Sequence, residues 1–72
     1  MNGTQSKMAR AALGWSTHQL AEAAGINRIT VVRFEKGEGV ADESASAIEK
    51  ALTGNGAQFS RLSGRVGVSV PE

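Results

Sequence analysis

The sequence predicts a small, mainly α-helical domain made of four short helices, followed by a short C-terminal β-hairpin. Three observations lead to this fold class. Glycines and polar capping residues divide most of the chain into short segments, apolar residues recur within these segments at helical spacing, and the last segment changes to strand-like alternation. The chain has 72 residues, which is enough for one domain with a small core.

The first helix is predicted over about residues 5–13, after a polar, flexible N-terminus at residues 1–4. The apolar residues at helical spacing within and after this segment are Met8, Ala11, Ala12 and Trp15. Gly14 is expected to end the helix, because glycine readily adopts the left-handed conformation found at helix C-termini.

The second helix is predicted over residues 17–24 by a capping box. Ser16 is a favourable N-cap, and Gln19 lies three residues later, where its side chain can bond back to the N-cap amide. Gly25 then suits the left-handed residue that ends a helix.

A third helix follows almost at once. Asn27 is a strong N-cap for a helix over residues 28–36, and Gly37 is expected to end it. Only Gly25 and Ile26 precede this cap after the second helix. The second and third helices are therefore joined by a tight turn.

A fourth helix and a hairpin complete the prediction. Asp42 is expected to cap a helix over residues 43–53. Beyond it, valines alternate with small or polar residues, which predicts strands at about residues 57–61 and 66–70, joined at the Ser63–Gly64 break. Because an isolated hairpin is marginally stable, this one should lie on the helices or pair with another chain.

The domain limits and the core follow from these elements. The helical domain is expected to span residues 5–54, and the hairpin tail residues 55–72. Nine residues should be mostly buried: Leu13, Trp15, Leu20, Ala21, Ile26, Val31, Phe34, Ile48 and Leu52.

Charge is distributed unevenly along the chain, although its net value is only +1. Residues 1–36 carry five basic and two acidic residues, a net charge of +3, whereas residues 37–72 carry three basic and five acidic residues, a net charge of −2. This asymmetry favours a polyanionic partner for the first half. The chain has no cysteine, which fits a cytoplasmic protein, and no apolar run approaches the roughly 20 residues that a membrane span requires.

One face of the helix predicted over residues 28–36 combines apolar and cationic side chains. That face carries Ile29, Val32, Arg33 and Lys36. Val31 and Phe34 lie opposite, where they can pack in the core. The mixed face suits the major groove of DNA, where arginine pairs with guanine and methyl groups contact thymine. The alternative is that Ile29 and Val32 are buried under another element.

Residues 7–53 resemble the Cro/repressor type of helix-turn-helix domain, also called the XRE family. The matching residues are Arg10, Ser16, Leu20, Ala21, Ala24, Gly25, Ile26, Asn27, Arg28, Val31, Phe34, Glu35, Gly37, Ile48 and Leu52. The resemblance implies a lambda-repressor-like four-helix domain. It also implies sequence-specific binding of double-stranded DNA by a transcriptional regulator, expected to be a repressor.

The resemblance also implies roles for individual residues. Positions that face base edges match Arg28, Ile29 and Arg33, and the bordering positions match Asn27, Thr30, Val32 and Lys36. Thr17, at the start of the second helix, would contact a phosphate. Arg10 and Glu35 would form an ion pair between the first and third helices. From the residues alone, the alternative is that Glu35 is simply solvated.

Other functional classes are less well supported. The chain has one histidine, no cysteine and no glycine-rich phosphate loop, so we expect neither an enzyme nor a catalytic residue, metal site or cofactor. The main alternative is a protein-interaction module on the same fold that has lost its groove contacts. The cationic face favours DNA, because a pure interaction module would not need it.

The expected partner is a near-palindromic DNA operator bound by a homodimer, and no membrane partner is expected. One helix contacts too few base pairs for useful specificity, and two-fold dimers solve this problem. The hairpin is expected to help form the dimer, because Val66, Val68 and Val70 make a strand edge with little to cover it. The alternative is that the hairpin only caps its own helices.

Overall fold

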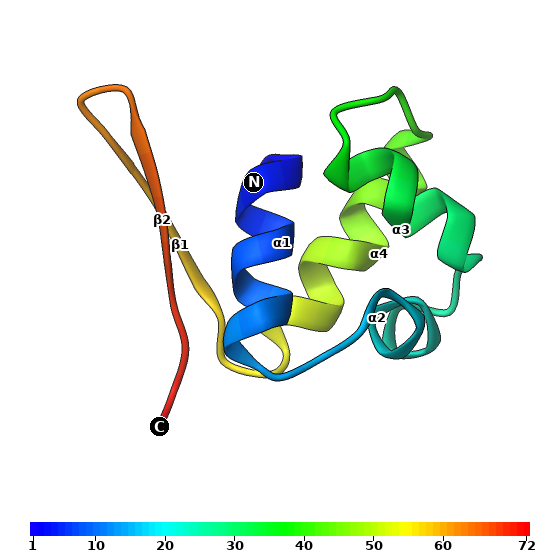
Figure 1. Cartoon of the computed structure of the whole chain (residues 1–72), viewed down its shortest axis with the longest axis horizontal. Coiled ribbons are helices and arrows are strands. Elements are labelled where there is room, and N and C mark those ends of the chain that lie inside the picture. Colours follow the sequence, from blue (N-terminus) through cyan, green and yellow to red (C-terminus); the bar gives the residue numbers. More distant parts are fainter.

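Four helices and one antiparallel hairpin follow one another along the chain in the computed structural model, which describes residues 1–72 (Figure 1). The elements are α1 (Gly3–Ala12), α2 (Thr17–Ala24), α3 (Arg28–Glu35), α4 (Asp42–Thr53), β1 (Gln58–Leu62) and β2 (Arg65–Ser69). This architecture confirms the predicted mainly α fold class with a C-terminal hairpin. In Figure 1, α1 stands between the hairpin on one side and α2 and α3 on the other. None of the helices is long and apolar enough to cross a membrane.

The core is formed by apolar side chains from all four helices and from the residue that precedes β1. Its buried members are Ala9, Leu20, Ala21, Val31, Ile48, Leu52 and Ala57. Five of the nine predicted core residues are among them. The other four are partly buried and pack against this cluster: Leu13, Trp15, Ile26 and Phe34. The predicted core is therefore in the right place, but its rim is more open to solvent than predicted.

α1 begins at Gly3, two residues before the predicted start, because Asn2 caps it. The Asn2 Oδ1 accepts the Gln5 N–H at 2.9 Å, and the Gln5 Oε1 accepts the Asn2 N–H at 3.0 Å. This reciprocal pair is a second capping box, which the sequence analysis missed. Gly3 and Thr4, assigned above to the N-terminal segment, are therefore helical.

The buried face of α1 also differs from the predicted one. The residues predicted as its apolar stripe are exposed: Met8, Ala11 and Ala12. The buried residues are Gln5, Ser6 and Ala9. Gln5 and Ser6 can be buried because their side chains find hydrogen-bond partners on distant segments of the chain, in the hairpin and in α3.

Three further helix boundaries differ from the prediction, the first being the end of α1, at Ala12 instead of residue 13. The predicted cap by Asp42 is wrong, because the N-cap of α4 is Ala41, which makes no side-chain hydrogen bond to the helix. Asp42 and Glu43 lie in the first turn instead, where negative charge interacts favourably with the helix dipole. α3 ends one residue earlier than predicted, with Lys36 as its C-cap.

The hairpin pairs β1 with β2 so that Leu62 lies opposite Arg65. The two residues between them have positive φ angles, 52° at Ser63 and 74° at Gly64, as a type I′ turn requires. The turn lies at the predicted break, and each strand is displaced by one residue toward it. Phe59 of β1 pairs with Val68 of β2, and both pack against the helical core.

Candidate nucleic-acid interface

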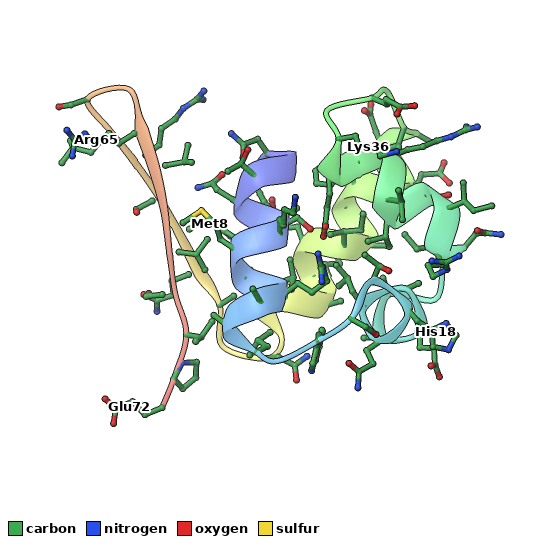
Figure 2. All side chains as sticks on the ribbon, in the orientation of Figure 1. Met8, His18, Lys36, Arg65 and Glu72 are labelled. Carbon is green, nitrogen blue, oxygen red and sulfur yellow. The ribbon has the colours of Figure 1, made fainter.

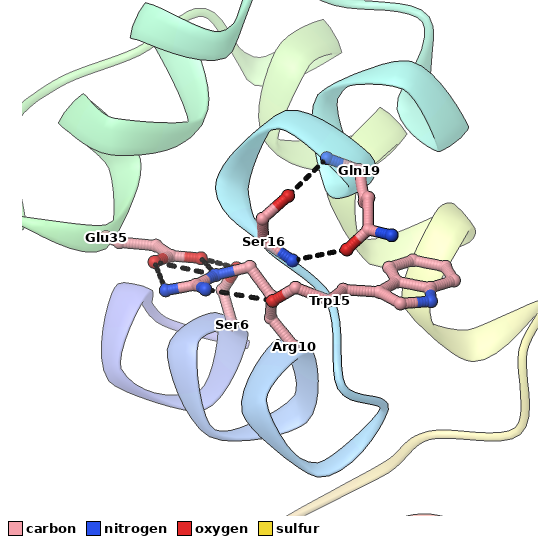
Figure 3. A network of polar contacts seen from close by, with 6 residues as sticks. All are labelled: Ser6, Arg10, Trp15, Ser16, Gln19 and Glu35. Carbon is pink, nitrogen blue, oxygen red and sulfur yellow. Dashed lines mark hydrogen bonds and ion pairs between the residues drawn. The ribbon is translucent and has the colours of Figure 1, made fainter.

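α2 and α3 are joined by a turn whose backbone is held by caps on both sides. Gly25 ends α2 with a φ of 70°, in the left-handed region. The Asn27 Oδ1 accepts the Ile29 N–H at 2.7 Å and so begins α3. At the start of α2, Ser16 and Gln19 form the predicted capping box, with hydrogen bonds of 3.1 and 2.7 Å (Figure 3). These caps stabilise the tight turn that sets α3 against α2.

α3 has one face in the core and one face open to solvent. Val31 is buried and Phe34 is half-buried. The exposed residues of the outer face, including the C-cap, are Arg28, Ile29, Arg33 and Lys36. Ile29 is 57% exposed, so the alternative that another element covers it is wrong. Thr30 and Val32 are half-buried, so the outer face is narrower than predicted.

The cations of this outer face have no acidic partners. The ion pairs of the protein join Arg10 to Glu35, His18 to Glu22, and the N-terminal amine to Glu49. Three exposed cations take part in none of them: Arg28, Arg33 and Lys36. His18 lies at the surface of α2, away from Lys36, with its Nε2 2.8 Å from the Glu22 carboxylate (Figure 2). The outer face of α3 is therefore a patch of unpaired positive charge around Ile29.

A shallow depression lies where α1, the start of α2 and the end of α3 meet. Its lining residues are Lys7, Arg10, Thr17, Val32, Glu35 and Lys36. Thr17 is the first residue of α2, where backbone N–H groups have no partner within the helix. Sequence analysis missed Lys7. The available signal was its spacing, because Lys7 precedes Arg10 by three residues and so lies on the same side of α1.

Arg10 of α1 and Glu35 of α3 form a bidentate ion pair beside this depression (Figure 3). The Arg10 Nη2 lies 2.9 Å from Glu35 Oε1, and the Arg10 Nε lies 3.1 Å from Oε2. Ser6 donates a further hydrogen bond to Oε2 at 3.1 Å, and the Arg10 Nη1 donates to the Trp15 carbonyl at 3.0 Å. The Glu35 side chain is only 6% exposed, and these partners satisfy both of its oxygens. The pair neutralises the only carboxylate of α3.

Comparison with known protein families agrees with this geometry. Residues 7–55 match a family model described as helix-turn-helix, of the Cro/C1 type. The matched segment contains the depression and the whole of α2, α3 and α4, and it ends before β1. No curated protein matches the chain.

Proposed function

Because the chain belongs to the Cro/C1-type helix-turn-helix family, whose members are DNA-binding transcription regulators, we propose that it binds a specific double-stranded DNA site through α3 and acts as a repressor. The observation that supports this proposal most directly is the outer face of α3, where unpaired cations surround an exposed isoleucine. Such a function places the protein in the cytoplasm, with the DNA that it regulates.

α3 offers two kinds of contact to base edges. Arg28 and Arg33 can each bind guanine O6 and N7 through two parallel hydrogen bonds, and Ile29 can pack against a thymine methyl group. The residues that border these three are Asn27, Thr30, Val32 and Lys36, which would contact bases or the sugar–phosphate backbone. Asn27 uses its Oδ1 to cap α3, so only its amide N–H groups remain free for DNA.

The depression beside α3 suits the DNA backbone. Lys7 and Lys36 supply positive charge there, and Thr17 supplies its hydroxyl group and the N–H group of the first residue of α2. The ion pair of Arg10 with Glu35 removes the repulsion that a free carboxylate would exert on a phosphate. The proposed role of these residues is to fix the orientation of α3 in the groove rather than to read sequence.

The protein is proposed to act as a homodimer on a near-palindromic operator. α3 has only eight residues, and its one exposed face reaches few base pairs. Two copies related by a two-fold axis would place their α3 helices in successive major grooves, about 34 Å apart along the DNA. The operator should therefore contain two inverted half-sites separated by about one helical turn.

The function can be tested by selecting binding sites from a random duplex library and titrating the best site at several salt concentrations. We expect a preferred near-palindromic site, with affinity that falls as salt rises because bound phosphates release counterions. Placing that site over a promoter should lower expression of a reporter. A protein-interaction module without groove contacts would instead show no preferred sequence, and an activator would raise reporter expression.

A further inference from the structure

A small depression lies between the start of α1 and the first strand of the hairpin. It has a volume of about 220 Å³, and its lining residues are Met1, Asn2, Gln5, Phe59, Ser60 and Arg61. Of the three depressions on the molecule, it is the only one without an acidic residue in its lining. It lies on the hairpin side of α1, whereas the proposed DNA interface lies on the side of α2 and α3 (Figure 1).

Arg61 supplies the only unbalanced charge of this depression. Its guanidinium takes part in none of the ion pairs of the protein, whereas the Met1 amine lies 3.7 Å from the Glu49 carboxylate. Strand alternation places Arg61 on the same face of the hairpin as Phe59, which packs against the helical core. Arg61 is thus on the side of the hairpin that faces α1. An unpaired arginine in a depression without carboxylates favours an anionic ligand.

Asn2 supplies a second hydrogen-bond donor to the same depression. Its Oδ1 accepts the Gln5 N–H at 2.9 Å, which fixes the side chain, and its Nδ2 donates to no group of the protein. Gln5 has no free donor, because its Nε2 donates to the Ser60 carbonyl at 2.9 Å and to the Gly67 carbonyl at 3.2 Å. These two bonds hold α1 against both strands of the hairpin, so the depression is formed before any ligand binds.

The other side chains available to a ligand are apolar, and the space is small. Met1 and Phe59 pack against the core cluster, but each is only half-buried and lines the depression. Sites for drug-sized ligands have volumes of roughly 300–1,000 Å³. The depression is smaller than this range, so its ligand should have a single ring or a short chain.

We propose that this depression binds a small monocarboxylate with an apolar body. Arg61 binds the carboxylate through two parallel hydrogen bonds, the Asn2 Nδ2 donates a third, and the apolar body packs on the Phe59 ring. A carboxylate fits better than a phosphate group, because Arg61 balances one negative charge and a phosphate group carries about two at neutral pH. A neutral ligand would leave the Arg61 charge unpaired.

The depression is connected to α3 through the first turn of α1. Gln5 lines the depression, and the next residue, Ser6, donates to the Glu35 carboxylate of α3 at 3.1 Å. Asn2 likewise precedes Gly3, which lies against the backbone of Glu35. A carboxylate that bridges Asn2 and Arg61 would stabilise the turn on which the end of α3 packs, and would thereby raise the affinity for DNA. This effector role rests on the proposed function, whereas the binding of the carboxylate does not.

The test uses sodium benzoate as the probe and benzamide as a neutral molecule of similar shape. Each is titrated into the isotope-labelled full chain at constant ionic strength, and the NMR shifts of the Asn2, Gln5 and Arg61 amides are followed. Arg61→Gln removes the proposed carboxylate contact. Arg65→Gln is the matched control, because it removes the same charge from an exposed residue on the opposite face of the hairpin. Circular dichroism checks that both variants are folded.

Benzoate should bind saturably to the wild type and to Arg65→Gln, with nuclear Overhauser contacts between its ring protons and those of Phe59. The dissociation constant should be about tenfold higher for benzamide with the wild type, and for benzoate with Arg61→Gln, because each lacks the charged bidentate contact. Three results would overturn the proposal: no saturable shift at millimolar benzoate, equal binding of benzoate and benzamide, or equal effects of the two substitutions.

The effector role is measured separately, by titrating the selected DNA site with and without saturating benzoate at the same ionic strength. Benzoate should raise the DNA affinity of the wild type by about fivefold or more, and should have no effect on Arg61→Gln. Unchanged or lower affinity of the wild type would overturn the effector role. A chain that binds benzoate but prefers no DNA sequence would overturn the proposed function and leave the carboxylate site in place.

Discussion

Gly3 of α1 lies directly against the backbone of Glu35 at the end of α3, so closely that a Cβ atom at residue 3 would approach the Glu35 Cα to 3.0 Å. The same atom would also collide with the Phe34 carbonyl oxygen. The first turn of α1 therefore packs on the backbone of α3, next to the ion pair of Arg10 with Glu35. Glycine is required here for close approach rather than for its backbone conformation.

Gly3→Ala should destabilise the protein by about 1–3 kcal/mol, because the added methyl group has only backbone atoms to displace. Gly39→Ala is the matched control, since a Cβ at Gly39 meets no atom within 4 Å. That control should be neutral or slightly stabilising, because it restricts the unfolded chain. Thermal and denaturant unfolding of both variants measure the difference. Equal stability of the two variants would show that α1 does not pack on α3 in this way.

The side chain of Leu20 is fully buried at the centre of the core. Leu20→Ala should cost about 2–5 kcal/mol in the free energy of unfolding, a large part of the stability of so small a domain. Leu62→Ala removes the same atoms from an exposed position and should change stability by about 0.5 kcal/mol or less. Chemical denaturation measures both. A melting temperature of Leu20→Ala close to that of the wild type would show that Leu20 does not pack at the centre of the core.

The ion pair between Arg10 and Glu35 should matter most when only one partner is removed. Arg10→Met leaves the nearly buried carboxylate of Glu35 with Ser6 as its remaining side-chain partner, and should cost about 3 kcal/mol. The double variant Arg10→Met with Glu35→Met leaves no unpaired charge and should be more stable than Arg10→Met alone. A double-mutant cycle measures the coupling. Additive losses would mean that the two side chains act independently.

Lys7 lines the depression between α1, α2 and α3 and is proposed to contact the DNA backbone. Lys7→Ala should weaken binding by a similar factor for all DNA sequences, and should reduce the slope of log affinity against log salt by about 1. Arg61→Ala removes the same charge from the hairpin and should leave the slope unchanged. Fluorescence anisotropy at several salt concentrations gives both slopes. An identical effect of the two substitutions would mean that Lys7 acts only through the net charge.

The helix-turn-helix could be predicted in detail because its signals are local. Capping residues determine where these helices begin and end. Ser16 and Gln19 form the capping box at the start of α2, Gly25 ends α2, and Asn27 begins α3. The structure shows each of these caps. The combination of apolar and cationic side chains on the outer face of α3 also follows from helical spacing alone. The residues that this spacing places together on the outer face, Ile29, Arg33 and Lys36, are all exposed in the structure.

The face of α1 could not be predicted in the same way, because its buried residues are polar. Gln5 is buried against Ser60 and Gly67, which lie more than 50 residues away, and Ser6 is buried against Glu35. Burial of a polar side chain depends on partners that only the folded chain supplies. Local spacing favours the apolar alternatives, which are in fact exposed. The position of Lys7 beside α3 depends on the same packing.

Sequence reading by α3 is tested most directly by measuring the binding of wild-type protein and Arg33→Ala to the selected site and to each of its single base-pair variants. The wild type should prefer the selected site over a scrambled duplex. Arg33→Ala should lose about 1–3 kcal/mol on the selected site and discriminate poorly at one base pair of each half-site, while keeping its preferences elsewhere. Equal affinity of the wild type for the selected and scrambled duplexes would show that α3 does not read DNA sequence.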